Sequence, residues 1–397
     1  MKILFITAGV LPVPVTKGGA VETLVEYIID ENEVEKKLDI DLISYYDKKS
    51  FEKSKKYKKT NFYFIKRNNK ITKLLGLFDR ILKKIKLQRF QNIENYDYLF
   101  QLKKIVQENN YDKIIVENRS PYINYLKKIT KDKLYLHLHN DYLNIKNPLA
   151  DEVYNNCDGI LTVSDYIKKC VYTINKNDTK TKTLINCTDT DLFNKEKNIV
   201  YRSKLREQLN ISEKDFVFLY SGRLTQEKGI KELLKAFKNI TDKSVKLLVL
   251  GSSWYGSNIK NKFQIELEEL AVDLKDKIIF TGFIDRDNVA RYHSIADVAI
   301  VPSMWEEPAG LVVLEAQASG MPVILTDSGG IPELANKNTS IIIKRDTEII
   351  EKIYEAMNDF VMNKNKSLEM GKEARKNAEK HNKKYYYNNF IEIMKEI

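Results

Sequence analysis

The sequence has few cysteines and no long apolar run, and each scarcity excludes a class of protein. Its three cysteines, Cys157, Cys170 and Cys187, cannot build a disulfide framework and are not spaced as metal ligands. The apolar runs have the length of strands and stay far below the roughly 20 residues that span a bilayer. Residues 1–6 lead directly into an apolar strand, without the basic region, long apolar segment and cleavage site of a secretory signal. We therefore expect a cytoplasmic protein.

Positive charge is concentrated in one segment. The chain has a formal net charge of +11, and residues 48–89 hold sixteen Lys or Arg residues against only Glu52 and Asp79. Apolar residues recur at helical spacing through 71–90, which predicts a basic amphipathic helix. Such a helix can bind the anionic inner face of a membrane, or it can pack on its own domain with its charges in solvent. Nucleic acid is not an expected partner, because no groove-reading motif or aromatic RNA platform is present.

Strand-sized apolar segments alternate with loops and helical segments along the chain. This alternation predicts an α/β fold with parallel sheets flanked by helices. The first series of predicted strands covers 3–7, 41–44, 113–116, 133–139 and 159–163. The second series covers 216–220, 247–250, 277–280, 298–301 and 323–325. Helices are predicted at 20–29, 202–209, 230–237 and 385–397.

The simplest architecture for these two series of strands is two Rossmann-like domains, one for each series. The polar and charged composition of 194–214 is typical of a connection between them. The predicted division is a first domain over 1–193, a linker over 194–214 and a second domain over 215–380. The terminal helix, in 381–397, is expected to pack back on the first domain.

The most informative stretch runs from Val301 to Ala316. It follows an apolar strand and continues into a helix that begins near Gly310, and ligands of open parallel sheets bind at such turns. Free amides and the helix dipole favour an anion at the helix start. Glu307 in the loop and Glu315 in the helix can address one elongated ligand, and carboxylates suit sugar hydroxyls. Alone, Glu315 can equally be a helix-surface carboxylate.

A second strand-to-helix turn, from Ser221 to Ile230, carries two cations. Gly222 permits close approach of the backbone, and Arg223 and Lys228 stand just before the predicted helix. Each charge-assisted hydrogen bond from such a cation contributes roughly 1.5–3 kcal/mol. The turn therefore suits a diphosphate.

Together these motifs resemble those of a known enzyme family. Ser-Gly-Arg-Leu with Glu-Lys-Gly-Ile in 221–230, Pro-Ser with Glu-x7-Glu in 302–315, and Ala-Ser-Gly-Met-Pro-Val in 318–323 are similar in order and spacing to the retaining GT-B glycosyltransferases of family 4. The resemblance covers most of the second domain, and 117–121 is similar to a bacterial subgroup of spore-coat and surface-polysaccharide enzymes. It implies an α/β GT-B fold, in which the parallel sheets of two Rossmann-like domains face a central cleft that binds a nucleotide sugar.

The resemblance also implies roles for residues of the second domain. Arg223 and Lys228 would bind the diphosphate, Glu315 the ribose, and Glu307 the hydroxyls of the donor sugar. The other implied donor contacts are Gly282 and Phe283 at the base, and the amides of Gly310, Leu311 and Val312. One departure is Ala309, which stands where the family usually has an aromatic residue and opens space beside the sugar.

Glycines and histidines mark strand ends in the first domain. Gly18 and Gly19, with Glu22 following, precede the first helix and resemble the family's N-terminal loop, which contacts the donor phosphates or the acceptor; we expect both glycines to be donor contacts, although a Gly-Gly pair is also a common turn. His137 and His139 share one face of a strand end. By resemblance His139 lies against the donor sugar, while His137 suits a hydrogen-bonded core position. Contacts with the acceptor or the donor sugar are expected from Glu117, Arg119, Asn140 and Asp141.

No obligatory metal cofactor is expected. The tripeptides Asp189-Thr190-Asp191 and Asp285-Arg286-Asp287 match a metal-binding signature of another glycosyltransferase fold, but neither follows an apolar strand within a single nucleotide domain. The cations of 221–230 and helix termini would assist the leaving diphosphate instead. The catalytic candidates, His139 and Glu307, would position the sugar during a transfer that retains anomeric configuration.

The sequence therefore predicts transfer of a hexose or N-acetylhexosamine from a nucleotide sugar, UDP-linked by expectation, to a glycan or lipid-linked acceptor in bacterial surface-polysaccharide synthesis. Two alternatives stay open. A GT-B epimerase or phosphorylase-like enzyme fits the architecture, but the Glu-x7-Glu element and the two cations fit transfer better. The second alternative is a catalytically silent subunit of an assembly complex, and the presence of both Glu307 and Glu315 argues against it.

Overall fold

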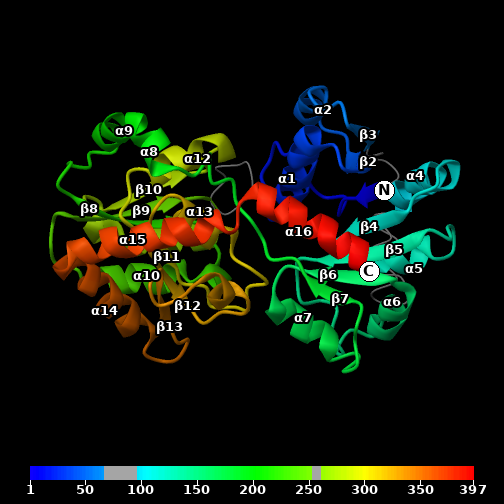
Figure 1. The fold of residues 1–397 in the computed structure, drawn as a ribbon. Helices are drawn as coiled ribbons and strands as arrows, with labels where there is room; N and C mark the ends of the chain where they lie inside the picture. The colour runs from blue at the N-terminus through cyan, green and yellow to red at the C-terminus, as the bar shows by residue number, and fades with distance from the viewer. Residues whose placement is uncertain (67–95, 253–260) are drawn as a thin grey trace. The chain divides into compact units, whose positions relative to one another are not determined.

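The structure, a computed structural model, describes residues 1–66, 96–252 and 261–397 (Figure 1). The predicted basic helix at 71–90 lies outside these residues. The chain forms two compact units, residues 1–184 with 387–397 and residues 185–386. The segment predicted as a linker, 194–214, is folded within the second unit. It contains α8 (Lys195–Asn198), the 3-10 helix η2 (Ile199–Tyr201) and α9 (Arg202–Gln208).

The first unit is built on a parallel seven-stranded sheet in the order β3-β2-β1-β4-β5-β6-β7. Its strands are β1 (Lys2–Ile6), β2 (Asp39–Tyr45), β3 (Thr60–Ile65), β4 (Lys113–Glu117), β5 (Lys133–Leu138), β6 (Gly159–Thr162) and β7 (Thr181–Thr183). All five strands predicted for this half are confirmed. The prediction misses β3, which lies in the Lys-rich segment, and β7, which consists of three polar residues.

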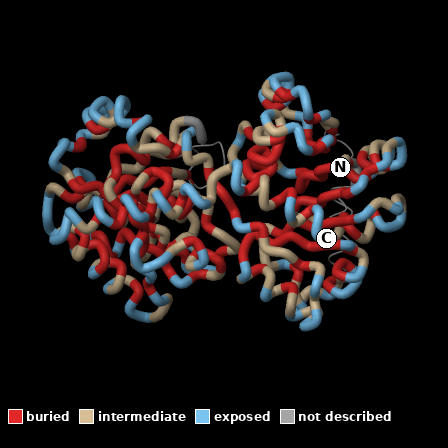
Figure 2. The backbone as a smooth tube through the Cα atoms, in the orientation of Figure 1, coloured by how far each residue is buried: buried red, intermediate tan, exposed pale blue. Residues whose placement is uncertain are grey.

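Helices connect these strands and bury their apolar residues. They are α1 (Ala20–Glu35), α2 (Lys48–Ser54), α4 (Tyr96–Glu108), α5 (Pro121–Leu126), α6 (Ala150–Asn156), α7 (Asp165–Tyr172) and α16 (Lys383–Glu396), the last shared with the second unit. Residues 3–6 of β1 are completely buried. Figure 2 colours the backbone by burial and shows the buried segments in red inside each unit. Within the described ranges, no helix is long and apolar enough to span a membrane.

The second unit is built on a parallel six-stranded sheet in the order β10-β9-β8-β11-β12-β13. Counted from β8, this is the 3-2-1-4-5-6 order of the dinucleotide-binding fold. Its strands are β8 (Phe216–Ser221), β9 (Val245–Leu250), β10 (Ile278–Gly282), β11 (Val298–Val301), β12 (Val323–Thr326) and β13 (Ser340–Ile343). The predicted strands and the α/β fold class are confirmed, and β13 is an addition.

Helices cover both faces of this sheet. Alternate residues of β8 belong to two core clusters, with Phe216 and Phe218 in one and Val217 and Leu219 in the other. This alternation follows from the two-residue period of a strand buried on both faces. The helices are η3 (Gln226–Lys228), α10 (Ile230–Phe237), α11 (Lys262–Leu270), η4 (Val272–Leu274), α12 (Arg286–His293), α13 (Leu311–Ala318), η5 (Ile331–Leu334), α14 (Ile349–Met362) and α15 (Lys364–Glu379).

The last residues of the chain complete the core of the first unit. The Phe390 ring is completely buried, with its centroid 5.7 Å from that of Phe5 in β1. The Tyr387 hydroxyl donates a hydrogen bond to Asn32 Oδ1 over 2.6 Å. The end of α16 is therefore a structural part of this unit.

Replacing Phe390 with alanine should destabilise the first unit by roughly 3–5 kcal/mol, because a buried ring is lost and a cavity remains. Chemical denaturation followed by circular dichroism measures the change. Tyr385→Ala is the matched control in the same helix, because Tyr385 is 55% exposed and its loss should cost less than about 0.5 kcal/mol. Equal effects of the two substitutions would contradict this role for α16.

Candidate active site

Both sheets reverse their strand order beside their first strand, and open parallel sheets bind ligands at such switch points. In the second unit the reversal lies between β8 and β11, which pair directly. The loop after β8 carries Arg223 and Lys228, and the loop after β11 carries Glu307. The two turns singled out in the sequence therefore leave neighbouring strands at the same edge of the sheet.

Lys228 and Glu307 form an ion pair that joins these two loops. Lys228 Nζ lies 2.5 Å from Glu307 Oε1, and the Ser303 hydroxyl donates a hydrogen bond to the same oxygen. The Lys228 ammonium also lies 5.4 Å from the centroid of the Trp305 ring. Because Glu307 is only 7% exposed, its carboxylate depends on these partners. A diphosphate bound to Lys228 would compete with Glu307 for the ammonium.

Backbone contacts fix the position of Glu307. Gly229 has a φ of 68°, and a Cβ there would overlap the carbonyl oxygen of Pro302, so only glycine lets the two loops approach this closely. The Glu307 amide donates to Ser328 Oγ over 3.2 Å, and the Gly330 amide donates to the Glu307 carbonyl over 2.7 Å. The carboxylate therefore projects from main chain that is held on both sides.

Arg223 and Phe283 line a hollow of about 170 Å³ at the ends of β8, β9 and β10. Arg223 Nη2 lies 3.5 Å from Glu227 Oε1, and the arginine side chain is 37% exposed. Gly282 ends β10 with a φ of 71° and lines a different hollow, of about 380 Å³, with residues of α11. Of the two expected base contacts, Phe283 thus shares the hollow of Arg223 and Gly282 does not line it.

The start of α13 offers backbone amides to an anion. Gly310 is the N-cap residue, and no side chain caps the helix, which leaves the amides of Leu311 and Val312 for a ligand. Glu315 lies one turn further along and is half-buried. The donor contacts expected of these four residues stay predictions.

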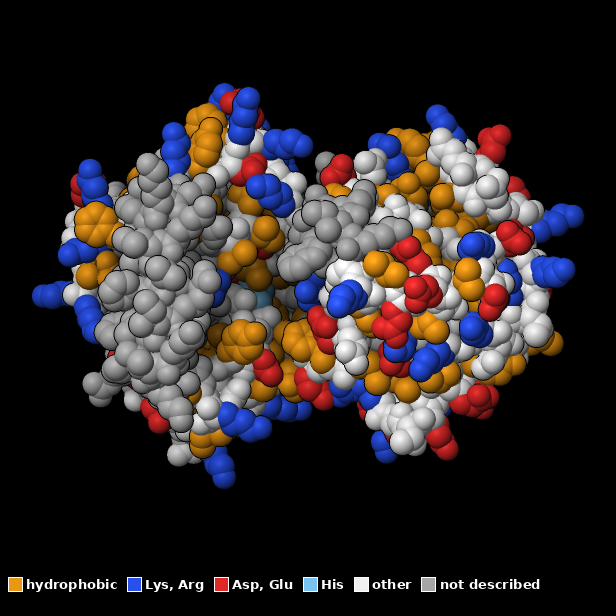
Figure 3. All heavy atoms as spheres, turned by 180° about the vertical axis from the view of Figure 1, so that it is seen from behind, with side chains coloured by type: hydrophobic (Ala, Val, Ile, Leu, Met, Phe, Trp, Pro, Cys, Tyr) orange, Lys and Arg blue, Asp and Glu red, His pale blue; other side chains and the backbone are white. Residues whose placement is uncertain are grey.

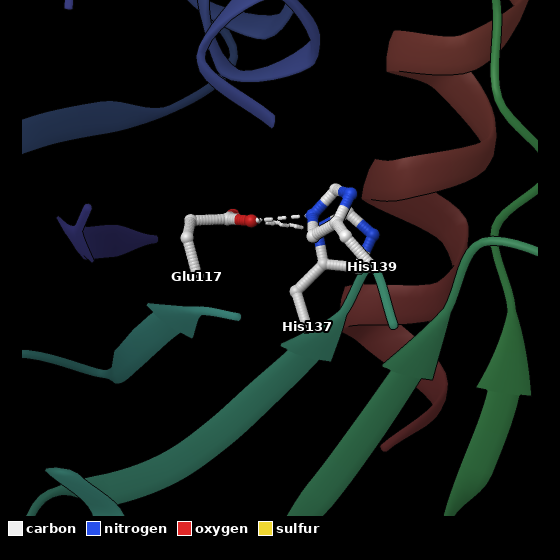
Figure 4. Close-up of side chains that lie close together, drawn as sticks. All are labelled: Glu117, His137 and His139. Carbon is white, nitrogen blue, oxygen red and sulfur yellow. Dashed lines mark hydrogen bonds and ion pairs between the residues drawn. The ribbon is translucent and has the colours of Figure 1, made fainter. Parts of the chain in front are cut away.

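In the first unit, Glu117 at the end of β4 holds two histidines at the end of β5 (Figure 4). Its Oε2 lies 3.1 Å from His137 Nδ1 and 2.8 Å from His139 Nε2. Glu117 is completely buried, and the His139 side chain is 6% exposed. Glu117, expected to contact a substrate, is therefore placed to orient His139 instead.

Burial and charge set the protonation of this cluster. Burial favours a neutral Glu117, but the two histidines outweigh it and lower the pKa of the carboxyl to about 2. Burial, together with His137, lowers the pKa of His139 to about 4, against the opposing effect of Glu117. Neutral His139 donates Nε2–H to Glu117, so its Nδ1 is a hydrogen-bond acceptor at pH 7.

The same three side chains have the residue types of metal ligands, and their ligand atoms lie within 4.8 Å of one another. The hydrogen bonds from both histidines already occupy the Glu117 carboxylate, and they account for the geometry without an ion. We therefore assign no metal to this cluster. Among the Asp-x-Asp tripeptides, Asp189 pairs with Lys383 at 2.7 Å and Asp191 with Lys197 at 2.6 Å.

A hollow of about 750 Å³ opens at the switch point of the first sheet, where β1 and β4 end. Arg119 and Asn140 line it, and Arg119 Nε donates to the Ala8 carbonyl over 3.1 Å. Asp141 lies on the same loop, and its carbonyl accepts a hydrogen bond from the Asn144 side chain over 2.6 Å. The fold thus brings two of the four expected substrate contacts to this hollow.

The loop from β1 to α1 borders the same hollow. Gly18 and Gly19 have φ values of 82° and 108°, conformations that favour glycine. Glu22, in the first turn of α1, and Tyr142, which is 69% exposed, also line the hollow. Sequence reasoning assigned no role to either. The signal for Glu22 was its place three residues after Gly19, whereas Tyr142 carried none.

Comparison with known proteins finds a family that matches the second unit. The model of the family described as glycosyl transferases group 1 matches residues 201–377. Spore coat protein SA of Bacillus subtilis (strain 168) is 27% identical over 389 residues, which cover 96% of this chain and 95% of that protein. The second unit thus matches the glycosyl transferases group 1, and the chain is similar to a named relative over nearly its whole length.

Further relatives agree with this assignment. The lipopolysaccharide 1,2-N-acetylglucosaminetransferase of Salmonella typhimurium is 36% identical over 135 residues, which are 33% of this chain and 35% of that protein. The crystal structure of Anabaena HepE in complex with UDP-glucose has a TM-score of 0.77 and 19% identity and covers 100% of both chains, a likeness of fold. The predictions of a GT-B fold and of a glycosyltransferase are confirmed.

The histidine cluster makes the stability of this glycosyltransferase depend on pH. Because the pKa of His139 falls from 6.5 to about 4 on folding, its contribution is present above pH 6.5 and is lost as the pH falls toward 4. The slope from this one group reaches about 1.4 kcal/mol per pH unit. Chemical denaturation between about pH 7 and 4.5 should show a shallower decline for His139→Gln than for the wild type. Identical slopes would show that His139 is not held neutral.

Proposed function

We propose that this glycosyltransferase transfers a hexosyl or N-acetylhexosaminyl group from a UDP-linked sugar, with retention of anomeric configuration, to a glycan or lipid-linked acceptor of bacterial surface polysaccharide. The observation that carries the proposal is the Lys228–Glu307 pair, 2.5 Å apart, which joins the loop after β8 to the loop that leads into the uncapped start of α13. A cation, a carboxylate and helix-start amides at the ends of two neighbouring strands have the chemistry that binds a sugar diphosphate.

The residues of the second unit would act through charge. Arg223, Lys228 and the amides of α13 would bind the diphosphate and stabilise the charge that develops on it as the sugar leaves, without a metal ion. Once Lys228 contacts the phosphates, Glu307 is released to accept hydrogen bonds from sugar hydroxyls, and Glu315 would bind the ribose. Neutral His139 would position the donor sugar, as its resemblance to the family histidine implies.

The relatives support the choice of donor and pathway class. HepE was crystallised with UDP-glucose, and the Salmonella enzyme carries the name of a lipopolysaccharide N-acetylglucosaminetransferase. Spore coat protein SA is named for the coat of the spore. We therefore propose a surface-glycan acceptor. The reaction would take place in the cytoplasm or at the inner face of the membrane.

Arg223→Ala should weaken binding of UDP-glucose by about 10- to 100-fold, because each charge-assisted hydrogen bond contributes roughly 1.5–3 kcal/mol. Isothermal titration calorimetry in the presence of a chelator measures the dissociation constant. Lys231→Ala is the matched control, because Lys231 pairs with Glu266 on the surface of α10 and α11. An unchanged dissociation constant in Arg223→Ala, or binding only after a divalent metal is added, would contradict the proposed donor site.

The basic segment 48–89 supports a peripheral contact with anionic lipid. Its sixteen basic and two acidic residues give a surplus larger than the net charge of the whole chain, so the rest of the chain is net negative. On the face that Figure 3 shows, acidic and basic side chains are interspersed over the second unit.

Replacing Lys83, Lys84 and Lys86 with glutamate should reduce co-sedimentation with phosphatidylserine liposomes, because each lysine near the membrane surface contributes about 1 kcal/mol to binding. Unaltered co-sedimentation would remove the basis for this contact.

A further inference from the structure

Arg345 bridges two loops of the second unit from a third. The strands β11, β12 and β13 are parallel neighbours in the sheet, so the loops that follow them leave at the same edge (Figure 1). Arg345, in the loop after β13, forms an ion pair with Glu306 Oε1 in the loop after β11. Its Nε lies 3.3 Å from Asp327 Oδ1 in the loop after β12, and its backbone amide donates to the same oxygen over 3.0 Å. One guanidinium thus connects two carboxylates on neighbouring loops.

The two bridged loops are the ones that fix Glu307. The second carboxylate oxygen of Glu306 accepts a hydrogen bond from the Gly329 amide over 2.7 Å. Gly329 has a φ of 52°, and a Cβ there would overlap the carbonyl oxygen of Glu307, so only glycine permits this approach. The backbone hydrogen bonds of Glu307 described above also go to the loop 327–330. The main chain of Glu307 therefore rests on a loop that Arg345 holds in place.

Stability of the fold does not explain this bridge. The side chains of Glu306 and Asp327 are 46% and 42% exposed, and ion pairs this exposed contribute little to the free energy of unfolding. The strands β12 and β13 are already joined by parallel backbone pairing. The loop 302–310, in contrast, has no helix or strand of its own between β11 and α13. The bridge therefore fixes the position of a loop that secondary structure does not fix.

Binding of a sugar diphosphate would make this support more important. Lys228 holds the Glu307 carboxylate from the loop after β8, and a diphosphate would attract its ammonium and weaken that bond. The remaining contacts come from the side of β12. They are those of the loop 327–330 and of Ser303, whose carbonyl accepts a hydrogen bond from the Thr326 hydroxyl over 2.7 Å. A shift of about 1 Å in a group that positions a substrate can cost about 10²-fold in rate.

We propose that Arg345 is a positioning residue, which keeps Glu307 in place to receive the donor sugar by joining its loop to the loop after β12. The inference rests on the proposed function, in which Glu307 accepts hydrogen bonds from the sugar hydroxyls. Arg345 itself would touch neither donor nor acceptor. It should affect the sugar part of the donor and leave the UDP part, bound by Arg223 and the amides of α13, unchanged.

The test compares UDP with UDP-glucose and uses water as the surrogate acceptor. In Arg345→Ala we expect the dissociation constant for UDP to stay within about twofold, while hydrolysis of UDP-glucose slows by about 10- to 100-fold. The midpoint of chemical denaturation should stay close to that of the wild type, because the lost pairs are exposed. Lys352→Ala is the matched control and should behave as the wild type, because Lys352 pairs with Asp346 and Glu348 at the start of α14.

A double-mutant cycle separates positioning from a general structural effect. Glu307→Gln removes the charge of the carboxylate that Arg345 is proposed to position and preserves the size of its side chain. If Arg345 acts through Glu307, Arg345→Ala should slow hydrolysis in the wild type and have little further effect in Glu307→Gln. Arg345→Lys should recover only part of the rate, because an ammonium keeps the charge but lacks the planar fork that bonds two carboxylates.

Two results would overturn the role of Arg345 and leave the proposed function intact. One is a wild-type rate of hydrolysis in Arg345→Ala, and the other is effects of the two substitutions that multiply in the double mutant. A wild type that neither binds nor hydrolyses any UDP-sugar would instead overturn the proposed function, and the role of Arg345 with it.

Discussion

The donor site proposed for the second unit depends on one ion pair, between Lys228 and Glu307. A buried carboxylate without a partner would destabilise the fold by about 3–5 kcal/mol. Lys228 reaches it because Gly229 lets the loop after β8 approach the loop after β11. The pair therefore fixes the two turns that the switch point of the sheet brings together. In the pair, the Lys228 ammonium and the Glu307 carboxylate neutralise each other. A bound diphosphate would attract the ammonium, and the carboxylate could then accept hydrogen bonds from the sugar.

The first unit has a corresponding switch point with different chemistry. Two histidines, rather than a lysine, satisfy the buried carboxylate of Glu117, and the cluster leaves His139 neutral at pH 7. Burial raises the pKa of the second carboxyl, Glu22, and the charge of Glu117 raises it further. One carboxylate is thus committed to orienting a histidine. The pKa of the other, Glu22, is raised to about 7 by its burial.

The fold was predictable from the sequence because strands buried on both faces appear as continuous apolar runs, as in 3–7 and 216–220. β7 was not predictable in this way, because its three polar residues do not form an apolar run. In the second unit, the order of the motifs predicted the turns that meet at Lys228 and Glu307. The partnership of Glu117 with His139 and the burial of Glu22 could not be predicted, because they depend on which strand ends and loops become neighbours in space.

Hydrogen–deuterium exchange with and without UDP-glucose, in the presence of a chelator, tests the donor site most directly. Our account predicts slower exchange in the peptides that cover 221–230 and 305–315, because the diphosphate would order the loop after β8 and bond to the amides at the start of α13. If calorimetry shows binding while the protection is confined to peptides of residues 1–184, the donor site is not at Lys228 and Glu307, and the account is contradicted.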